Sequence, residues 1–197
     1  MTRWFTSDWH LGHSRVIDLV PRPFGSVEEM NETILSNMES VIGPDDITLI
    51  VGDLGLGKRR ETIPMVKRIP GRKILSSGNH DDTFQMHSKA AKARLQYIEW
   101  GLDDVVDGLE LTLADGTDVL VDHFPYKGDH QDYEDRYPEY RPRDDGKWLI
   151  HGHVHELWRV NGRQINVGVD AWDFMPVSED QICNIINGFD PGDINGS

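Results

Sequence analysis

The sequence contains one cysteine among 197 residues and no run of about 18 apolar residues. A single cysteine, Cys183, excludes an internal disulfide framework and is typical of a protein kept in a reducing compartment. Without a long apolar run no transmembrane helix is predicted, and the first residues lack the apolar core and cleavage site of a signal peptide. We therefore expect a cytoplasmic protein with no membrane partner.

Basic residues are scarce compared with acidic ones. The chain has 20 Lys and Arg against 34 Asp and Glu, so its formal net charge is −14. A protein that grips long nucleic acid through its phosphates needs a basic surface, so we expect no stable complex with a nucleic-acid polymer. A small anionic substrate is compatible with this acidity if bound metal ions supply local positive charge. Solubility alone is the competing explanation for most of the carboxylates.

Strand and helix patterns alternate through the first half of the chain. Apolar, β-branched and aromatic runs predict strands at residues 3–8, 47–51 and 73–77. Helical spacing of apolar residues predicts helices at residues 14–20, 26–42, 58–69 and 83–95. Pro64 should interrupt the third of these helices. This order predicts an α/β domain with a largely parallel sheet.

The pattern changes in the second half. Two turn signals, Asp115-Gly116 and Asn161-Gly162, predict hairpins that pair 104–114 with 117–124 and 157–160 with 164–169. Residues 127–147 are nearly all polar, charged or aromatic, which predicts a long surface loop or lid-like insertion. Ser178 should cap a last helix. We expect one domain over residues 1–188, followed by a flexible tail over residues 189–197.

Five places share one feature, which is that a predicted strand ends and Asp, Asn or His follows at once. They are Asp8/His10, Asp53, Asn79/His80, His123 and His153/His155. Ligands of open α/β sheets bind at the carboxyl ends of the strands, so these side chains should converge on one edge. His153 and His155 would face the same side if the backbone there is extended.

The chemistry of this set is coherent. Carboxylate, imidazole and amide ligands suit Mn²⁺, Fe or Zn²⁺ and need no thiolate. Seven ligands exceed what one tetrahedral ion takes but fit two ions that share a carboxylate, about 3.5–4 Å apart, as in sites for in-line displacement at phosphorus. Each motif alone is weak, because His-x-His also forms structural or single-metal sites and Gly-Asn-His-Asp also forms simple turns.

In this order, the motifs Asp-x-His, Gly-Asp, Gly-Asn-His-Asp, His and Gly-His-x-His resemble the calcineurin-like metallophosphoesterase superfamily. The resemblance runs from Asp8 to His155, and residues 166–170 also resemble small bacterial and phage-type members. It implies a four-layer α/β/β/α sandwich, in which two central mixed β-sheets are flanked by helices. One departure is Leu54-Gly55-Leu56, where many relatives have a second acidic residue after Gly-Asp.

The resemblance also implies roles for the residues. The first metal would be held by Asp8, His10 and His155, and the second by Asn79, His123 and His153. Asp53 would bridge both ions and so belong to the catalytic machinery. His80 would bind no metal and would stabilise the transition state or protonate the leaving oxygen. Two further residues should support the ligands without binding metal, namely His151 and Asp81.

The function implied is hydrolysis of small phosphodiesters by attack of a metal-bridging hydroxide. Nucleotide-type diesters, including cyclic nucleotides, are favoured because the chain is short and has no large capping domain. A phosphomonoesterase acting on nucleotides or phosphoproteins is the alternative, and a non-catalytic metal-binding scaffold is a third reading. Mn²⁺ is the favoured metal, with Fe, Zn, Ni or Co as alternatives. No pattern predicts an oligomeric state.

Several cationic and aromatic residues lie in the predicted site loops. Arginine and lysine side chains there could contact phosphate, and an aromatic side chain could stack on a base. The candidate substrate contacts are Arg15, Tyr126, Lys127 and Arg143, together with Arg22 and Arg141. His13 borders the first motif and could reach the substrate or pack against the turn.

Overall fold

The computed structural model describes residues 1–129 and 134–189. The predicted tail, residues 189–197, lies outside the described residues except for Phe189. Four residues of the predicted lid, 130–133, also lie outside them. Within the described ranges, no helix has the length and apolar character needed to span a bilayer.

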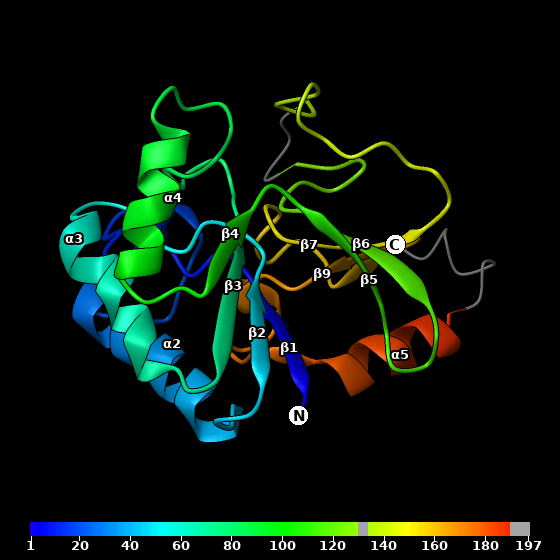
Figure 1. The fold of residues 1–197 in the computed structure, drawn as a ribbon, viewed down its shortest axis with the longest axis horizontal. Helices are drawn as coiled ribbons and strands as arrows, with labels where there is room; N and C mark the ends of the chain where they lie inside the picture. Colours follow the sequence, from blue (N-terminus) through cyan, green and yellow to red (C-terminus); the bar gives the residue numbers. More distant parts are fainter. Residues whose placement is uncertain (130–133, 190–197) are drawn as a thin grey trace.

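Two five-stranded mixed sheets form the centre of the molecule (Figure 1). The first sheet has the order β10-β1-β2-β3-β4, with bounds β1 Arg3–Thr6, β2 Ile47–Ile50, β3 Arg72–Ser76, β4 Asp104–Val106 and β10 Val177–Ser178. Strands β1 to β4 run parallel, and β10 pairs with β1 in the antiparallel sense. This sheet is therefore the largely parallel one that the first half of the sequence predicts.

The second sheet has the order β5-β6-β7-β9-β8. Its strands are β5 Leu109–Thr112, β6 Asp118–Val121, β7 Trp148–His151, β8 Val160–Asn161 and β9 Gln164–Asn166. The three inner strands are parallel, and the edge strands β5 and β8 are antiparallel to their neighbours. Because β6, β7 and β9 point the same way, their carboxyl ends lie at one edge.

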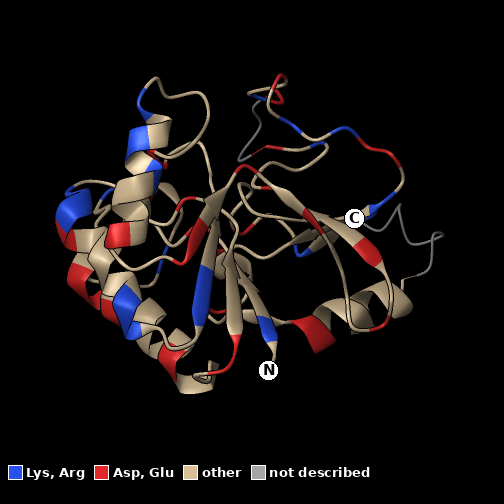
Figure 2. Ribbon diagram, in the orientation of Figure 1, with Lys and Arg blue, Asp and Glu red and all other residues tan. Residues whose placement is uncertain are grey.

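Helices flank the two sheets. They are α1 Val16–Leu19, α2 Val27–Val41, α3 Arg59–Thr62, α4 Ala90–Glu99 and α5 Glu179–Asn187, with 3₁₀ helices η1 Ile63–Arg68 and η2 Val169–Ala171. Figure 1 shows α2, α3 and α4 on one side of the first sheet and α5 below the β5–β6 hairpin. Charged residues lie mainly on these helices and on the long loop before β7, whereas the strands are mostly uncharged (Figure 2).

Two apolar cores hold the layers together. Phe5 of the first sheet and Ile150 of the second share the core between the sheets, which also contains Ile182 of α5. Leu75 of β3 belongs to the other core, with Met30 of α2. The first sheet therefore packs against the second sheet on one face and against helices on the other, which produces the layers of the fold. The predicted class of two mixed sheets flanked by helices is confirmed.

Three predicted elements differ from the structure. The strand predicted over 104–114 is divided at Gly108, whose φ is +97°, so that β4 joins the first sheet and only β5 pairs with β6. The helix predicted over 58–69 becomes 3₁₀ from Ile63 onward, with Pro64 in its first turn. The helix predicted from residue 83 begins only at Ala90.

The late start of α4 has a local cause. Residues 81–89 form successive turns, in which the Phe84 N–H donates to Asp81 O and the Ala90 N–H donates to His87 O, both at 3.0 Å. The Asp81 carboxylate also accepts hydrogen bonds from the backbone N–H groups of Asp53 and Gly78. These contacts tie the segment to the ends of β2 and β3 and compete with helix formation.

Candidate metal centre

The carboxyl ends of five strands meet at one place between the sheets. A parallel bridge between Ser7 and Gly168 joins the end of β1 to the segment that follows β9. The candidate residues follow the strand ends: Asp8 and His10 after β1, Asp53 after β2, Asn79 and His80 after β3, His123 after β6, and His153 and His155 after β7. The structure therefore brings together all eight residues, which the chain separates by up to 147 positions.

Asp53 lies in the middle of this set. Its Oδ2 is 3.6 Å from His10 Nε2 and 3.6 Å from His123 Nε2. The His10 ring stacks on His155 with centroids 5.2 Å apart, while the His123 ring lies 5.3 Å from that of His153. One carboxylate oxygen is thus equidistant from one imidazole of each candidate metal group, which is the place of a bridging ligand.

The candidate ligands are buried, and some of their polar atoms have no hydrogen-bond partner. All seven are at most 9% exposed, yet Asp8 Oδ1 and both ring nitrogens of His10 have no partner. A buried polar atom without a partner costs free energy. A bound cation would supply the missing partner, so this donor set fits a divalent metal.

The clustering of donor atoms agrees with this fit. Among the described residues, two groups of carboxylate and imidazole atoms lie within 4.8 Å of one another. The groups are Asp8, His10 and His155, and Asp8, Asp53 and His123. The amide oxygen of Asn79 lies 3.1 Å from His123 Nε2, so an amide ligand is also within reach of the second group.

The backbone is unusual at the candidate ligands. Eight described non-glycine residues have positive φ, and five of them are candidate ligands with φ between +51° and +72°: Asp8, His10, Asp53, His153 and His155. This left-handed conformation is unfavourable for such residues and persists only where the surroundings enforce it. The expectation of an extended backbone at His153 and His155 is therefore wrong. Strand β7 ends at His151, and a turn brings both rings to one cavity of about 230 Å³.

Two glycines permit the close approach of the strand ends. A Cβ on Gly152 would lie 1.9 Å from Ser7 Oγ and 2.5 Å from Asp8 Oδ2. A Cβ on Gly78 would lie 2.3 Å from Asp53 Oδ1. Glycine is required at both positions because any side chain would push two ligand-bearing segments apart.

His155 is oriented by a buried ion pair. Its Nδ1 lies 2.8 Å from Asp170 Oδ2, and Asp170 accepts two hydrogen bonds, of 2.7 and 2.8 Å, from Arg22. Arg22 also donates to the carbonyl oxygen of Asp8 at 2.7 Å, and its side chain is fully buried. A carboxylate on Nδ1 favours metal binding through Nε2. Arg22 thus supports the ligands, and its predicted contact with substrate is wrong.

Two other ligand imidazoles, those of His123 and His153, also have partners. His123 Nδ1 lies 2.9 Å from Val51 O, and His153 Nε2 lies 3.0 Å from Asp129 Oδ1. Asp129 is a buried residue of the predicted lid that the sequence reasoning missed. No local motif marks it, since its only signal is an acidic residue in an acidic loop.

The two residues expected to support the ligands differ in what they touch. Asp81 accepts hydrogen bonds from the backbone N–H groups of Asp53, Leu54 and Gly78 and so fixes the turn that carries the bridging carboxylate. Burial, reinforced by the neighbouring Asp53 carboxylate, raises the pKa of Asp81 to about 7. The His151 ring instead contacts the carbonyl oxygen of Gly152.

The electrostatics favour the protonation states that metal binding needs at His10, His153 and Asp53, whereas, although burial opposes it, nearby carboxylates raise the pKa of His123 and of His155. Burial lowers the pKa of His10 well below its usual value and lowers that of His153 to about 4. Although burial opposes it, the histidines around Asp53, His123 foremost, hold the pKa of this carboxyl below its usual range. Neutral imidazoles around an ionised carboxylate are the forms that coordinate a cation.

His80 differs from the ligands in its exposure. It is exposed, and it lines a cavity of about 230 Å³ together with His10, Asp53, His153 and His155. Its backbone N–H donates to Asp53 Oδ1 at 2.9 Å, and its carbonyl oxygen accepts from Arg59 at 2.8 Å. The backbone of His80 is therefore fixed against the bridging carboxylate while its ring lies at the cavity.

The predicted substrate contacts lie elsewhere. Tyr126 and Lys127 line a separate cavity of about 470 Å³, and neither Arg15 nor Arg143, both exposed, is among the described residues that line the 230 Å³ cavity. Arg141 donates hydrogen bonds to the carbonyl oxygens of Pro125 and Gly128 and to the Asp129 carboxylate. The lining of the 230 Å³ cavity includes His13 and also Arg136, which was not among the residues predicted from the sequence.

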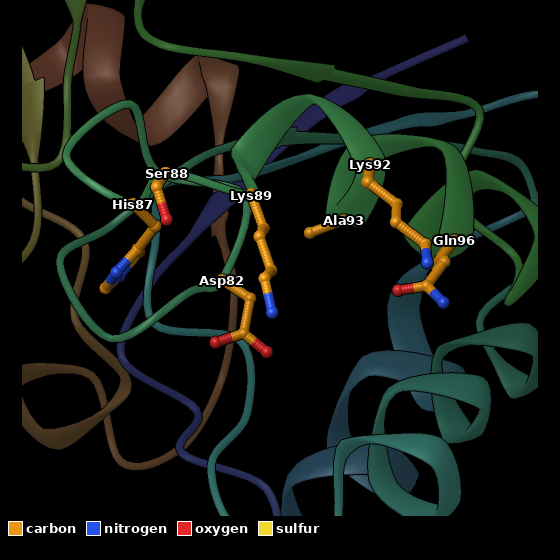
Figure 3. Close-up of a pocket in the computed structure, with 7 residues that line it drawn as sticks. All are labelled: Asp82, His87, Ser88, Lys89, Lys92, Ala93 and Gln96. Carbon is orange, nitrogen blue, oxygen red and sulfur yellow. The ribbon is translucent and has the colours of Figure 1, made fainter.

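A further cavity, of about 480 Å³, lies at the start of α4 (Figure 3). Its lining includes Asp82, His87, Lys89 and Lys92, and none of the candidate metal ligands. Figure 3 shows these side chains on one helix and on the turn before it. We call this the α4 cavity and the 230 Å³ one the ligand cavity.

Two mixed sheets carry buried carboxylates, imidazoles and an amide at their joined ends, a donor set that fits divalent metal ions. The family model for calcineurin-like phosphoesterases matches residues 1–157, and the chain belongs to this family. The predicted membership in the superfamily is thereby confirmed.

The chain is similar to phage proteins over nearly its whole length. It is 41% identical to the Gene 66 protein of Mycobacterium phage L5 over 198 residues, covering 93% of each chain. It is 35% identical to the Gene 66 protein of Mycobacterium phage D29, covering 96% of this chain and 98% of that one. A crystal structure of a protein of unknown function from Aquifex aeolicus superposes with a TM-score of 0.70 at 28% identity, over 93% of this chain and 98% of that chain.

Proposed function

We propose that this protein hydrolyses small phosphodiesters of nucleotide type, cyclic nucleotides included, with two divalent cations, Mn²⁺ first among them. The observation that carries the proposal is the position of Asp53 Oδ2, 3.6 Å from an imidazole of each candidate metal group. A single bound ion would not explain why Asp53 lies between the two groups, whereas a pair of ions that share one carboxylate would explain it.

In this proposal each residue has one task. Asp8, His10 and His155 hold one cation, Asn79, His123 and His153 hold the other, and Asp53 contacts both. When bound, the two cations activate the attacking water and neutralise the charge of the phosphate.

His80 acts on the leaving group. As water attacks phosphorus, the bond from phosphorus to the leaving oxygen breaks, and the imidazolium of His80 gives that oxygen a proton. The exposure of His80 and its place in the lining of the ligand cavity support this role. The cavity volume of about 230 Å³ favours a small substrate over a polymer.

A phosphomonoesterase is the second candidate, and one observation favours it. A monoester carries a terminal dianion, which a cation of the lid would stabilise, and Arg136 of the lid lines the ligand cavity. The two functions differ in the preferred substrate.

The deciding experiment compares initial rates on bis-p-nitrophenyl phosphate and p-nitrophenyl phosphate. Metal-stripped protein is reloaded with Mn²⁺, and in parallel with Fe²⁺, Zn²⁺, Ni²⁺ and Co²⁺. A higher kcat/KM for the diester supports the phosphodiesterase, and cyclic nucleotides are tested next. A higher value for the monoester makes the phosphomonoesterase the better reading. Failure to cleave either ester with any of these metals leaves the non-catalytic scaffold.

Replacement of His80 tests the proton donor. We expect His80→Ala to lower kcat about 10²- to 10⁴-fold on a cyclic nucleotide, whose alkoxide leaving group needs a proton. The loss should be smaller on p-nitrophenyl esters, because p-nitrophenolate leaves without one. Metal content, measured by inductively coupled plasma mass spectrometry, should stay at two per chain.

His87→Ala is the matched control, because His87 lines the α4 cavity, whose described lining includes no candidate metal ligand. It should leave both rates unchanged. Loss of metal from His80→Ala would contradict the assigned role, and so would an equal loss of rate on both kinds of leaving group.

A further inference from the structure

Arg136 holds a distinctive place in the ligand cavity. Among the described residues that line it, Arg136 is the one lysine or arginine. The other polar lining residues are His10, His13, Asp53, His80, His153 and His155. A guanidinium beside this set faces the place where the proposed function puts the substrate phosphate.

A buried carboxylate fixes this guanidinium. Asp129 Oδ1 accepts hydrogen bonds from Arg136 Nη2 at 2.6 Å and from Arg136 Nε at 3.1 Å, and Asp129 Oδ2 accepts from the Arg136 backbone N–H at 2.9 Å. Arg141 Nη2 donates to Asp129 Oδ2 at 3.0 Å. The Asp129 side chain is fully buried while that of Arg136 is 44% exposed, and the charge-assisted hydrogen bonds to Asp129 orient the guanidinium.

The same carboxylate also holds a candidate metal ligand. Asp129 Oδ1 lies 3.0 Å from His153 Nε2 as well as 2.6 Å from Arg136 Nη2. One oxygen atom therefore links the orientation of a ligand imidazole to that of the lid arginine. Although burial opposes it, the hydrogen bonds from His153 and Arg136 keep the pKa of Asp129 well below its usual range, and the contact of Asp129 with Arg136 is an ion pair.

We propose that Arg136 binds a non-bridging oxygen of the substrate phosphate and that Asp129 is the positioning residue that sets Arg136 beside His153. The inference rests on the proposed function, since it names the protein's own contact to the phosphate in that reaction. The chemistry suits an arginine, whose planar fork matches the oxygens of a phosphate. In a chain of net charge −14, a fixed cation at the cavity also offsets the repulsion of an anionic substrate.

The proposal predicts a dependence on substrate charge. A contact to phosphate contributes to ground-state binding, so its removal should raise KM more than it lowers kcat. A monoester dianion should lose more affinity than a diester monoanion, because the guanidinium interacts with twice the charge.

The test compares Arg136→Ala with Arg163→Ala in Mn²⁺-loaded protein. The control is closely matched, because the side chains of Arg136 and Arg163 are 44% and 43% exposed, each paired with an aspartate, and Arg163 lines a different cavity. The probe is inorganic phosphate, measured by isothermal titration calorimetry, followed by KM and kcat on both p-nitrophenyl esters.

We expect Arg136→Ala to weaken phosphate binding about 10- to 100-fold, with metal content unchanged and Arg163→Ala within twofold of the wild type. Arg136→Lys should recover only part of the loss, since a lysine cannot reproduce the fork. Asp129→Asn should weaken phosphate binding and Mn²⁺ binding together, which a purely structural role of Arg136 would not produce.

The outcomes separate this inference from the proposed function. If Arg136→Ala binds phosphate as Arg163→Ala does, the inference is wrong while the function stands. If the wild type binds phosphate through Arg136 but cleaves neither ester, the proposed function fails and the phosphate contact stands. If the Mn²⁺-loaded wild type binds no phosphate at millimolar concentration, the inference is overturned.

Discussion

The ligand cavity and the α4 cavity are built in opposite ways. The ligand cavity measures about 230 Å³ and is lined by residues that follow the ends of β1, β2, β3, β6 and β7. The α4 cavity is about twice as large, at about 480 Å³, but its described lining comes from one helix and the turn before it. The smaller cavity is therefore lined from the segments after five separate strands, and the larger one from a single stretch of chain.

The two linings also differ in how firmly they are held. The candidate metal ligands in the lining of the ligand cavity, which are His10, Asp53, His153 and His155, are buried and have positive φ, whereas Lys89 and Lys92 are exposed. Preorganised donors are what a metal site requires, and long solvated side chains lose rotamer freedom when they bind. In this protein, a metal site is therefore indicated by the number of separate segments that line a cavity and by the burial of their polar side chains, and not by the volume of the cavity.

The largest expected effect is that of Asp53→Asn. Removal of the bridging charge should reduce metal content below two per chain and lower kcat/KM on the order of 10³-fold or more, since the ions supply several kcal/mol of transition-state stabilisation. Metal analysis and initial rates measure both.

Asp82→Asn makes the same chemical change in the α4 cavity and should leave metal content and rate at wild-type values. If Asp53→Asn retained two metals and activity, or if Asp82→Asn lost them, the two cavities would not differ as described.

A smaller effect is expected from Asp170→Asn, which tests whether the Asp170 carboxylate holds His155 in the ligand cavity in place. Loss of the carboxylate on His155 Nδ1 should weaken Mn²⁺ binding about 10- to 100-fold. It also leaves the buried Arg22 charge without its counter-ion, which should cost on the order of 3 kcal/mol in the free energy of unfolding. Mn²⁺ titration and urea unfolding measure the two effects.

The matched control for this variant is Asp173→Asn. The Asp173 side chain is 95% exposed and lies 3.6 Å from Arg159, so its replacement should change neither quantity appreciably. Equal behaviour of the two variants would show that the Arg22–Asp170 pair does not support His155.

The smallest effect belongs to the α4 cavity itself. Replacing Lys89 and Lys92 together by glutamine removes both lysines from its lining. We expect kcat, KM and metal content to change less than about twofold, because an exposed charge away from the site is largely screened. A rise in KM as large as that expected for Arg136→Ala would show that the α4 cavity belongs to the substrate site.

The strand ends could be found from the sequence because two local signals coincide there. Apolar runs predict β1, β2 and β3, and a polar residue such as Asp53 or Asn79 follows each run at once. The extended backbone expected at His153 was wrong, since local periodicity does not show that the turn takes positive φ. The delayed start of α4 was missed for a similar reason, because the contacts of Asp81 that hold the turn come from other strands.

The family, the α/β class and the order of the metal-binding motifs could be predicted from the sequence, because these depend on hydrophobic pattern and on residues near each other in the chain. How the ligands are held, and which arginine lines the ligand cavity, became visible only in the folded chain. Asp129 meets His153 across 24 residues, and Arg22 meets Asp170 across 148. Such contacts depend on the paths of loops between strands, which no local propensity encodes.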